Sequence, residues 1–196
     1  VPIAIKGKGG QESVISDDEH PRPGTTLDNL AKLPPFFRKG GTVTAGNSSG
    51  LTDAAAALVL TTESEAQKLG AKPLAEVLGV ASGAVHPKEM GLGPVPATIK
   101  ILKSLNFSLA DFDLIEINEA FAAQVLACER ELKWEPARRN IRGGAIALGH
   151  PIGCTGARIT VTLLHSLIQE DKELGLATLC VSGGQGMALV LKRLGT

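Results

Sequence analysis

The sequence predicts an α/β fold in which helices cover a mixed five-stranded sheet. Short apolar runs alternate with segments of helical periodicity from residue 53 onward, and this alternation is typical of layered α/β proteins. The composition agrees, because 43% hydrophobic and 20% charged residues in a chain of 196 are the balance of a folded globular protein.

The first regular elements are expected after a long loop. Residues 1–50 are rich in Gly, Pro, Asp and Ser, which predicts ordered loop. The small apolar run at 54–60 predicts a buried strand. A helix is expected at 61–69, because threonines stand at its start, glutamates lie in its first turn and Gly70 follows its end.

The rest of the chain predicts four more strands and three more helices. The strands are expected at 74–83, 114–117, 176–181 and 187–191, and the helices at 96–105, 119–132 and 155–169. A glycine-rich turn at 183–186 separates the last two strands, which suits a hairpin.

Composition excludes several classes of partner. Twenty basic residues balance twenty acidic ones, so nothing indicates binding to nucleic acid or to an anionic membrane. No apolar run reaches the roughly 18–20 residues that a membrane span needs. Three cysteines without paired spacing or a metal-type cluster indicate reduced thiols, no bound metal and a cytoplasmic location, with any targeting peptide upstream of Val1. Four arginines are interpreted as a solvated face or as partners in ion pairs: Arg138, Arg139, Arg142 and Arg158.

Two glycine-rich turns carry the candidate chemistry. One holds His150 in GHPIG (149–153), and the other follows Cys180 in CVSGGQG (180–186). Dense glycines let the backbone approach a ligand and present bare N–H groups to it. An imidazole and a thiol on such turns are typical of a site that moves protons and stabilises an oxyanion. Together with Asn118, which opens the segment NEAFAAQ, they indicate one active site.

Structural interpretations stay open beside these functional ones. His150 alone would be a turn histidine, and Asn118 directly precedes a helix, where Asn is a favoured N-cap. Cys128 is interpreted as a small buried hydrophobe, whereas Cys154 lies at a helix start and competes as the reactive thiol. The sulfur of Cys180 is expected to border a cavity, because the residues after it are small.

Taken together, these blocks closely resemble the thiolase family. NEAFAAQ (118–124), GGAIALGHPIGCTGAR (143–158) and CVSGGQG resemble three of its active-site blocks, in its order and spacing. TVTAGNSSG (42–50) and MGLGP (90–94) resemble further thiolase segments. The resemblance covers essentially all 196 residues and implies the layered thiolase fold.

The resemblance also implies a division of the chain into three parts. Residues 1–52 resemble the end of the loop domain that covers coenzyme A, 53–73 the last strand and helix of the N-terminal thiolase domain, and 74–196 the C-terminal domain. In this family the nucleophilic cysteine lies in the N-terminal half, and none of the three cysteines here has a setting that resembles it. We therefore expect the nucleophile outside this chain, and we expect the fragment alone to be inactive.

Roles follow from the resemblance residue by residue. His150 resembles the histidine that activates the nucleophile, Cys180 the second cysteine that works as general acid and base, and Asn118 the asparagine that fixes a water in an oxyanion hole shared with that histidine. Ser182 stands where the family usually has glycine, at a position whose backbone N–H serves an oxyanion hole, so its φ angle bears on the geometry of that hole. The residues that resemble those around the pantetheine arm and the acyl group are Ser49, Phe37, Met90, Ala120 and Phe121.

The activity that the resemblance implies is that of an acetyl-CoA acetyltransferase. Such an enzyme condenses two acetyl-CoA molecules into acetoacetyl-CoA, or runs the reverse thiolysis, with coenzyme A thioesters as substrates and no cofactor. The expected partners are an acyl-CoA, the N-terminal half of the thiolase and further copies in a dimer or tetramer. Two alternatives stay open: a related condensing enzyme such as a ketoacyl synthase, against which the Cys180 turn argues, and a non-catalytic thiolase-like subunit or interaction module.

Overall fold

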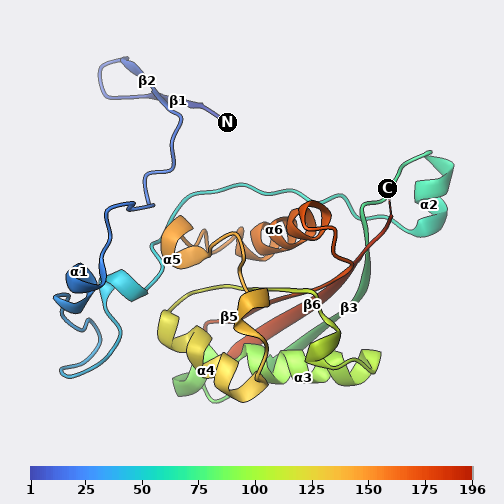
Figure 1. The fold of residues 1–196 in the computed structure, drawn as a ribbon. Helices are drawn as coiled ribbons and strands as arrows, with labels where there is room; N and C mark the ends of the chain where they lie inside the picture. Colours follow the sequence, from blue (N-terminus) through green and yellow to red (C-terminus); the bar gives the residue numbers. More distant parts are fainter. Residues whose placement is uncertain (196) are drawn as a thin grey trace.

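A computed structural model describes residues 1–195 and contains the expected α/β layers. Its main sheet has four strands in the order β3-β6-β5-β4 (Figure 1). The strands are β3 (Ala75–Ala84), β4 (Leu114–Ile117), β5 (Leu174–Val181) and β6 (Gln185–Arg193). β4 runs parallel to β5, whereas β6 is antiparallel to both of its neighbours, so the sheet is mixed. The predicted fold class is confirmed, but the sheet has four strands instead of five.

Helices cover both faces of this sheet. Helices α3 (Pro94–Leu105) and α4 (Ala122–Leu132) lie on one face, and α6 (Thr155–Gln169) lies on the other (Figure 1). Side chains alternate along β4, so that Ile115 and Ile117 join the core with α3 and α4, while Leu114 packs with α6. The predicted helices are thus confirmed, although α4 begins at Ala122 instead of at residue 119. The first predicted helix is also present, as α2 (Glu63–Lys68).

The strand predicted at 54–60 does not form. In the described chain this segment has no regular secondary structure, and Val59 and Leu60 are 98% and 72% exposed. It runs along the side of the molecule that carries α5 (Ala145–Leu148) and α6 (Figure 1). A short apolar run becomes a buried strand only where a sheet offers it backbone partners. The segment pairs with none of the described strands, because the sheet consists of β3, β6, β5 and β4 alone and no described bridge involves residues 54–60.

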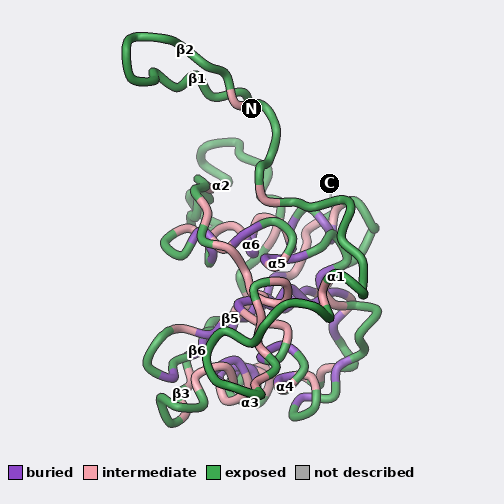
Figure 2. The backbone as a smooth tube through the Cα atoms, turned by 90° about the vertical axis from the view of Figure 1, so that its left-hand side faces the viewer, coloured by how far each residue is buried: buried purple, intermediate pink, exposed green. Residues whose placement is uncertain are grey.

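The first fifty residues contain more regular structure than their composition predicts. Strands β1 (Ile3–Lys6) and β2 (Glu12–Ile15) form an antiparallel hairpin, and the short helix α1 (Leu27–Ala31) follows. The hairpin projects from the body and is almost entirely exposed (Figure 2). The prediction of loop is therefore wrong at these three elements. Within residues 1–195, no helix combines the length and the apolar character that crossing a membrane requires.

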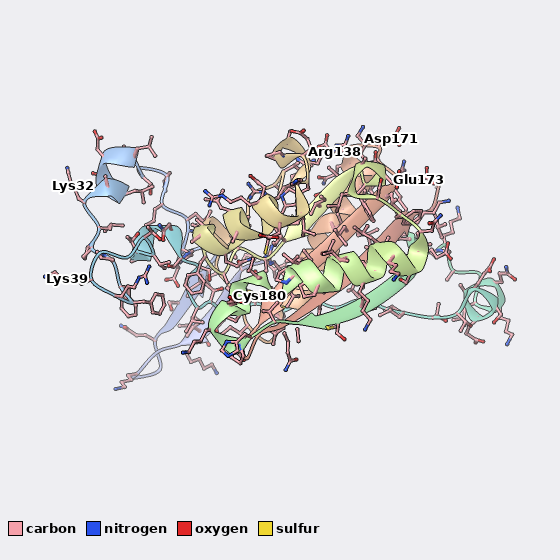
Figure 3. The ribbon with its side chains drawn as sticks, turned by 90° about the horizontal axis from the view of Figure 1, so that it is seen from below. Lys32, Lys39, Arg138, Asp171, Glu173 and Cys180 are labelled. Atoms are coloured by element: carbon pink, nitrogen blue, oxygen red, sulfur yellow. The ribbon has the colours of Figure 1, made fainter. Side chains whose placement is uncertain are left out.

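The carboxyl ends of β4 and β5 meet at one edge of the sheet, which we call the carboxyl edge. Because the two strands are parallel, Ile117 lies opposite Thr178, and the chain leaves both strands on the same side. Cys180 lies at this end in Figure 3, whereas Asp171 and Glu173, which precede β5, lie at the opposite end. The carboxyl edge therefore gathers residues from separate parts of the sequence, as such edges commonly do at ligand sites of α/β proteins.

Candidate active site

Asn118 is the first residue after β4 and lies at the carboxyl edge. Its backbone N–H donates to the Thr178 carbonyl at 3.0 Å, which holds it beside β5. The residue is completely buried, and its side-chain Oδ1 has no hydrogen-bond partner in the described chain. Helix α4 begins only at Ala122, with Phe121 in the N-cap position, so the interpretation of Asn118 as an N-cap is wrong. The amide is instead directed to the site, where a buried polar group requires a partner.

His150 lies on the turn between α5 and α6, and its ring reaches Asn118. The Nε2 atom of the imidazole is 3.3 Å from Nδ2 of Asn118. The backbone N–H of His150 donates to the Gly50 carbonyl at 2.8 Å, which ties the turn to an earlier loop. Gly149 has a φ of +97°, and a Cβ there would lie 2.2 Å from the Thr52 side chain, so only glycine fits. The glycine before the histidine is thus required by both backbone angle and space.

The second nitrogen of the imidazole also has a partner. Nδ1 of His150 lies 2.6 Å from Oγ1 of Thr155, the first residue of α6. Thr155 is 1% exposed, and its hydroxyl donates to the Pro151 carbonyl at 3.0 Å. The ring is therefore held from two sides, by the carboxyl edge and by the start of α6.

Burial shifts the pKa values of His150 and Cys180 in opposite directions. Burial, followed by the nearby positive charge of Arg158, lowers the pKa of His150. Burial raises the pKa of the Cys180 thiol, and a backbone hydrogen bond opposes this only in part. At neutral pH the site therefore holds a neutral imidazole and a protonated thiol.

The three cysteines have different surroundings. Cys128 is fully buried, its Sγ donates to the Gly91 carbonyl at 3.2 Å, and burial raises the pKa to about 11. Its interpretation as a buried hydrophobe is confirmed. Cys154, at the N-cap position of α6, lines a hollow of about 480 Å³ together with His150. Cys180 is 7% exposed and does not line this hollow, so the hollow gives no support to the expectation that the Cys180 sulfur borders a cavity.

The glycine turn after Cys180 packs closely on the chain that follows β3. Gly184 has a φ of +93°, and a Cβ on it would lie 2.3 Å from the Val85 carbonyl oxygen. Its own carbonyl accepts from the Val85 N–H at 2.8 Å. Ser182 is exposed and is not among the described non-glycine residues that have a positive φ. Serine therefore fits this position of the turn without backbone strain.

Ser49 and Ala120 contact each other where an early loop of the chain meets the loop after β4. The backbone N–H of Ser49 donates to the Ala120 carbonyl at 3.0 Å, and the Ser49 hydroxyl reaches the same oxygen at 3.2 Å. The next residue, Gly50, accepts the backbone hydrogen bond from His150. This short stretch of chain therefore connects the loop after β4 with the histidine turn.

Aromatic side chains extend this contact. Phe37 packs edge-on against Phe121, with ring centroids 5.7 Å apart. Met90 lies in the 3₁₀ segment η2 (Pro87–Leu92), which packs on α4. Five residues are expected around the pantetheine arm and the acyl group. Described contacts join four of them in pairs, Ser49 with Ala120 and Phe37 with Phe121, whereas Met90 belongs to a neighbouring segment.

Glu119 was not singled out by the motif analysis, yet it connects the loop after β4 with Asn140 and with the start of α5. One of its carboxylate oxygens accepts from Nδ2 of Asn140 at 2.8 Å, and the other accepts from the Ile146 N–H at 3.2 Å. The Asn140 side chain bonds the N–H and the carbonyl of Ile117, at 2.9 and 3.0 Å. A Cβ on Gly144 would lie 2.2 Å from the Glu119 carboxyl, so the glycine leaves room for it. We call these hydrogen bonds of Glu119 the clamp. In the sequence, the acidic residue beside Asn118 and the paired glycines at 143–144 are the features that could have indicated it.

Glu119→Ala is expected to lower the free energy of unfolding by about 2 kcal/mol, because two partly buried donors lose their acceptor. Urea unfolding measures this value, and Glu131→Ala, an exposed glutamate on α4, serves as the control. The control is expected to change the free energy of unfolding by less than about 0.5 kcal/mol. Equal, small effects of the two substitutions would contradict the clamp.

Two of the four arginines form ion pairs within the described chain. Arg139 pairs with Glu129 at 3.4 Å, and Arg142 pairs with Glu170, so the interpretation as ion pairs is confirmed for these two.

Among residues 1–195, no group of His, Cys, Asp and Glu side chains has an arrangement that would hold a metal ion.

Comparison with known proteins identifies relatives of almost the whole chain. A family model described as "Thiolase, C-terminal domain" matches residues 71–193, and one described as "Thiolase, N-terminal domain" matches residues 1–64. The acetyl-CoA acetyltransferase of Pseudomonas aeruginosa is 54% identical, over 98% of this chain and 49% of its own length.

Two solved structures share the fold. The crystal structure of the Bacillus anthracis acetyl-CoA acetyltransferase superimposes with a TM-score of 0.94 at 53% identity, over 99% of this chain and 49% of that one. Human mitochondrial 3-ketoacyl-CoA thiolase, in complex with CoA, gives a TM-score of 0.86 at 44% identity, over 93% of this chain and 46% of that one. The chain thus spans about half the length of the relatives it matches.

Proposed function

This chain belongs to the thiolase family, and from that premise we propose that it forms the C-terminal part of an acetyl-CoA acetyltransferase. The reaction is the condensation of two acetyl-CoA molecules to acetoacetyl-CoA, or the reverse thiolysis. The observation that supports it best is the pairing of His150 Nε2 with Asn118 Nδ2 at the carboxyl edge, where Cys180 lies next to the final residue of β5. Acyl-CoA, a further polypeptide half and other copies of the protein are the proposed partners.

The nucleophile in this proposal lies outside the 196 residues. The thiolate is the nucleophilic form of cysteine, so a thiol whose pKa is raised by burial is a poor nucleophile. This applies to Cys128 and to Cys180. Cys154 is the remaining competitor, since it is partly exposed and borders the hollow beside His150.

His150 is proposed to start the first half-reaction. Its Nε2 takes the proton of the nucleophilic thiol, and the resulting thiolate attacks the thioester carbonyl of acetyl-CoA. The bond between that carbonyl and the coenzyme A sulfur breaks, and the leaving thiolate takes the proton of Cys180. The nucleophile is then acetylated, His150 is an imidazolium and Cys180 is a thiolate.

Cys180 is proposed to act as the base in the second half-reaction. Burial destabilises its thiolate, which favours removal of a weakly acidic α-proton from a second acetyl-CoA. The resulting enolate carbon attacks the acetylated nucleophile, a carbon–carbon bond forms, and the bond to the nucleophile sulfur breaks. That sulfur regains its proton from His150, so every group returns to its starting state.

The enolate oxygen requires donors while it forms, and His150 and Asn118 are proposed to supply them. The imidazolium donates from Nε2–H to the enolate oxygen. The unpartnered Oδ1 of Asn118 is suited to accept a hydrogen bond from a water, whose second hydrogen then points to the enolate oxygen. The Ser182 N–H is proposed for the second hole, which receives the oxygen of the acetylated nucleophile. Loss of one oxyanion-hole donor typically costs about 2.7–4 kcal/mol of transition-state stabilisation.

Five residues are proposed to line the path of the pantetheine arm and the acyl group: Ser49, Phe37, Met90, Ala120 and Phe121. Support comes from the contacts that join the first loop of the chain to the residues after Asn118. A solved relative at 44% identity is named as a complex with CoA, which is consistent with this proposal.

Enzyme assays of the complete reading frame that encodes this chain test the proposal. Thiolysis of acetoacetyl-CoA is expected with the complete polypeptide and not with the 196-residue chain alone, because the chain lacks a suitable nucleophile. Robust thiolysis by the chain alone would overturn the external nucleophile and would assign that role to Cys154. A folded complete polypeptide that forms no acyl-enzyme would favour the alternative, a non-catalytic thiolase-like subunit.

A further inference from the structure

We propose that Thr155 is a positioning residue that keeps the proton of the neutral His150 ring on Nδ1, so that Nε2 is free to act as the base. Its effect on catalysis rests on the proposed function, whereas its effect on the ring is a property of this chain. The inference stands on the hydrogen bonds that surround the imidazole at both of its nitrogens.

The Thr155 hydroxyl has one hydrogen, and that hydrogen has a partner. The hydroxyl is 3.0 Å from the Pro151 carbonyl, which only accepts hydrogen bonds. The same carbonyl also accepts from the backbone N–H groups of Cys154 and Thr155, at 2.7 and 2.8 Å. In the arrangement that we propose, the hydroxyl donates to this carbonyl, and its oxygen accepts from Nδ1 at 2.6 Å. Nδ1 then carries the ring hydrogen.

The opposite side of the ring leads to the same proton arrangement. Nε2 faces Nδ2 of Asn118 at 3.3 Å, and an amide nitrogen only donates. A neutral imidazole has one donor and one acceptor nitrogen, so Nε2 is the acceptor when Nδ1 carries the proton. Each contact is satisfied in this tautomer, whereas the other tautomer would set donor against donor at Nε2.

The contact at Nδ1 suits both states that the proposed cycle gives to His150, whereas the contact of Nε2 with the Asn118 amide nitrogen suits only the neutral ring, because both of these nitrogens are donors in the imidazolium state. The neutral ring and the imidazolium both have a hydrogen on Nδ1, so the Thr155 oxygen accepts in either state and the ring needs no rotation. Only Nε2 gains and loses a proton. Thr155 is 1% exposed, so water does not replace its hydroxyl as a partner.

The ring proton can be observed directly in the chain itself. Two-bond ¹H–¹⁵N spectra of the imidazole rings distinguish the two neutral tautomers when the pH is above the pKa of the ring. His150→Gln removes one set of signals and so assigns them, while His20, His86 and His165 remain as internal references. The expected result for the wild-type chain is a dominant Nδ1–H tautomer. A dominant Nε2–H tautomer would overturn the inference without any variant of Thr155.

Two substitutions at Thr155 and a matched control test the cause. Thr155→Val removes the hydroxyl at nearly constant volume and is expected to reduce the ratio of Nδ1–H to Nε2–H about three- to tenfold. Thr155→Ser keeps the hydroxyl and is expected to retain the wild-type ratio. Thr160→Val is the control, because the Thr160 hydroxyl makes the same kind of bond within α6, to the Gly156 carbonyl at 2.7 Å, away from the imidazole.

A changed ratio in Thr155→Val alone supports the inference, whereas equal ratios in Thr155→Val and the wild type overturn it. If Thr155→Val does not fold, the Thr155→Ser spectrum and the wild-type spectrum still decide between the tautomers. In the complete polypeptide, kcat of Thr155→Val is expected to fall about three- to tenfold, with full recovery in Thr155→Ser. Inactive wild-type protein with the Nδ1–H tautomer would overturn the proposed function and leave the assignment of the ring proton standing.

Discussion

Cys180→Ser is expected to leave acyl transfer to the nucleophile measurable while carbon–carbon bond formation is largely abolished. A serine hydroxyl is far less acidic than a thiol, so it does not supply the base that removes the α-proton. Loss of a general base typically costs about 10²–10⁴ in rate. The first half-reaction suffers less, because water also protonates the thiolate of coenzyme A. The acetylated nucleophile is therefore expected to accumulate when the complete polypeptide is incubated with acetyl-CoA.

Mass spectrometry of peptides measures the acetylated fraction, and acetoacetyl-CoA formation measures the second step. Cys154→Ser is the matched thiol control, and both half-reactions are expected to persist in it. Equal loss of both half-reactions in Cys180→Ser would contradict the assignment, because a structural role of this buried residue at the end of β5 would explain that result better.

His150→Ala is expected to damage both half-reactions. Its Nε2 first takes the proton of the nucleophile and then presents that proton to the enolate oxygen, so each step loses a group that acts on the reacting atoms. We expect a fall of about 10²–10⁴ in acyl transfer alone, the range of a lost general base. Rapid-quench measurement of acyl-enzyme formation separates this step from condensation. Unchanged acyl transfer in His150→Ala would contradict the role of the ring as the base.

The layers and the motif residues of this chain were predictable, because both depend on local chemistry. Helix α6 has the predicted bounds, since its apolar residues recur at helical spacing and pack on one face of the sheet. Cys180 and Asn118 were recognisable at strand ends, and His150 was recognisable beside a glycine that the turn requires. Each of these signals lies within a few residues of the position that it marks.

The supporting residues were not predictable, because their roles arise from contacts between distant segments. Glu119 becomes a clamp only when the loop after β4 meets the start of α5 and Asn140. Thr155 follows His150 closely in sequence, yet its contact depends on the rotation of the imidazole ring. The run at 54–60 has the apolar composition of a strand, but a strand also requires backbone partners, and this segment pairs with no strand of the described sheet.

The central claim is that His150 and Asn118 form one oxyanion site, and a double-mutant cycle on the condensation step tests it most directly. Asn118→Ala is expected to slow carbon–carbon bond formation about 10²–10³-fold, the typical effect of one lost donor. Because both residues act on one oxygen, the His150→Ala/Asn118→Ala double variant is expected to lose clearly less than the product of the two single losses. Strictly multiplicative losses would place the two residues at separate sites and contradict the account.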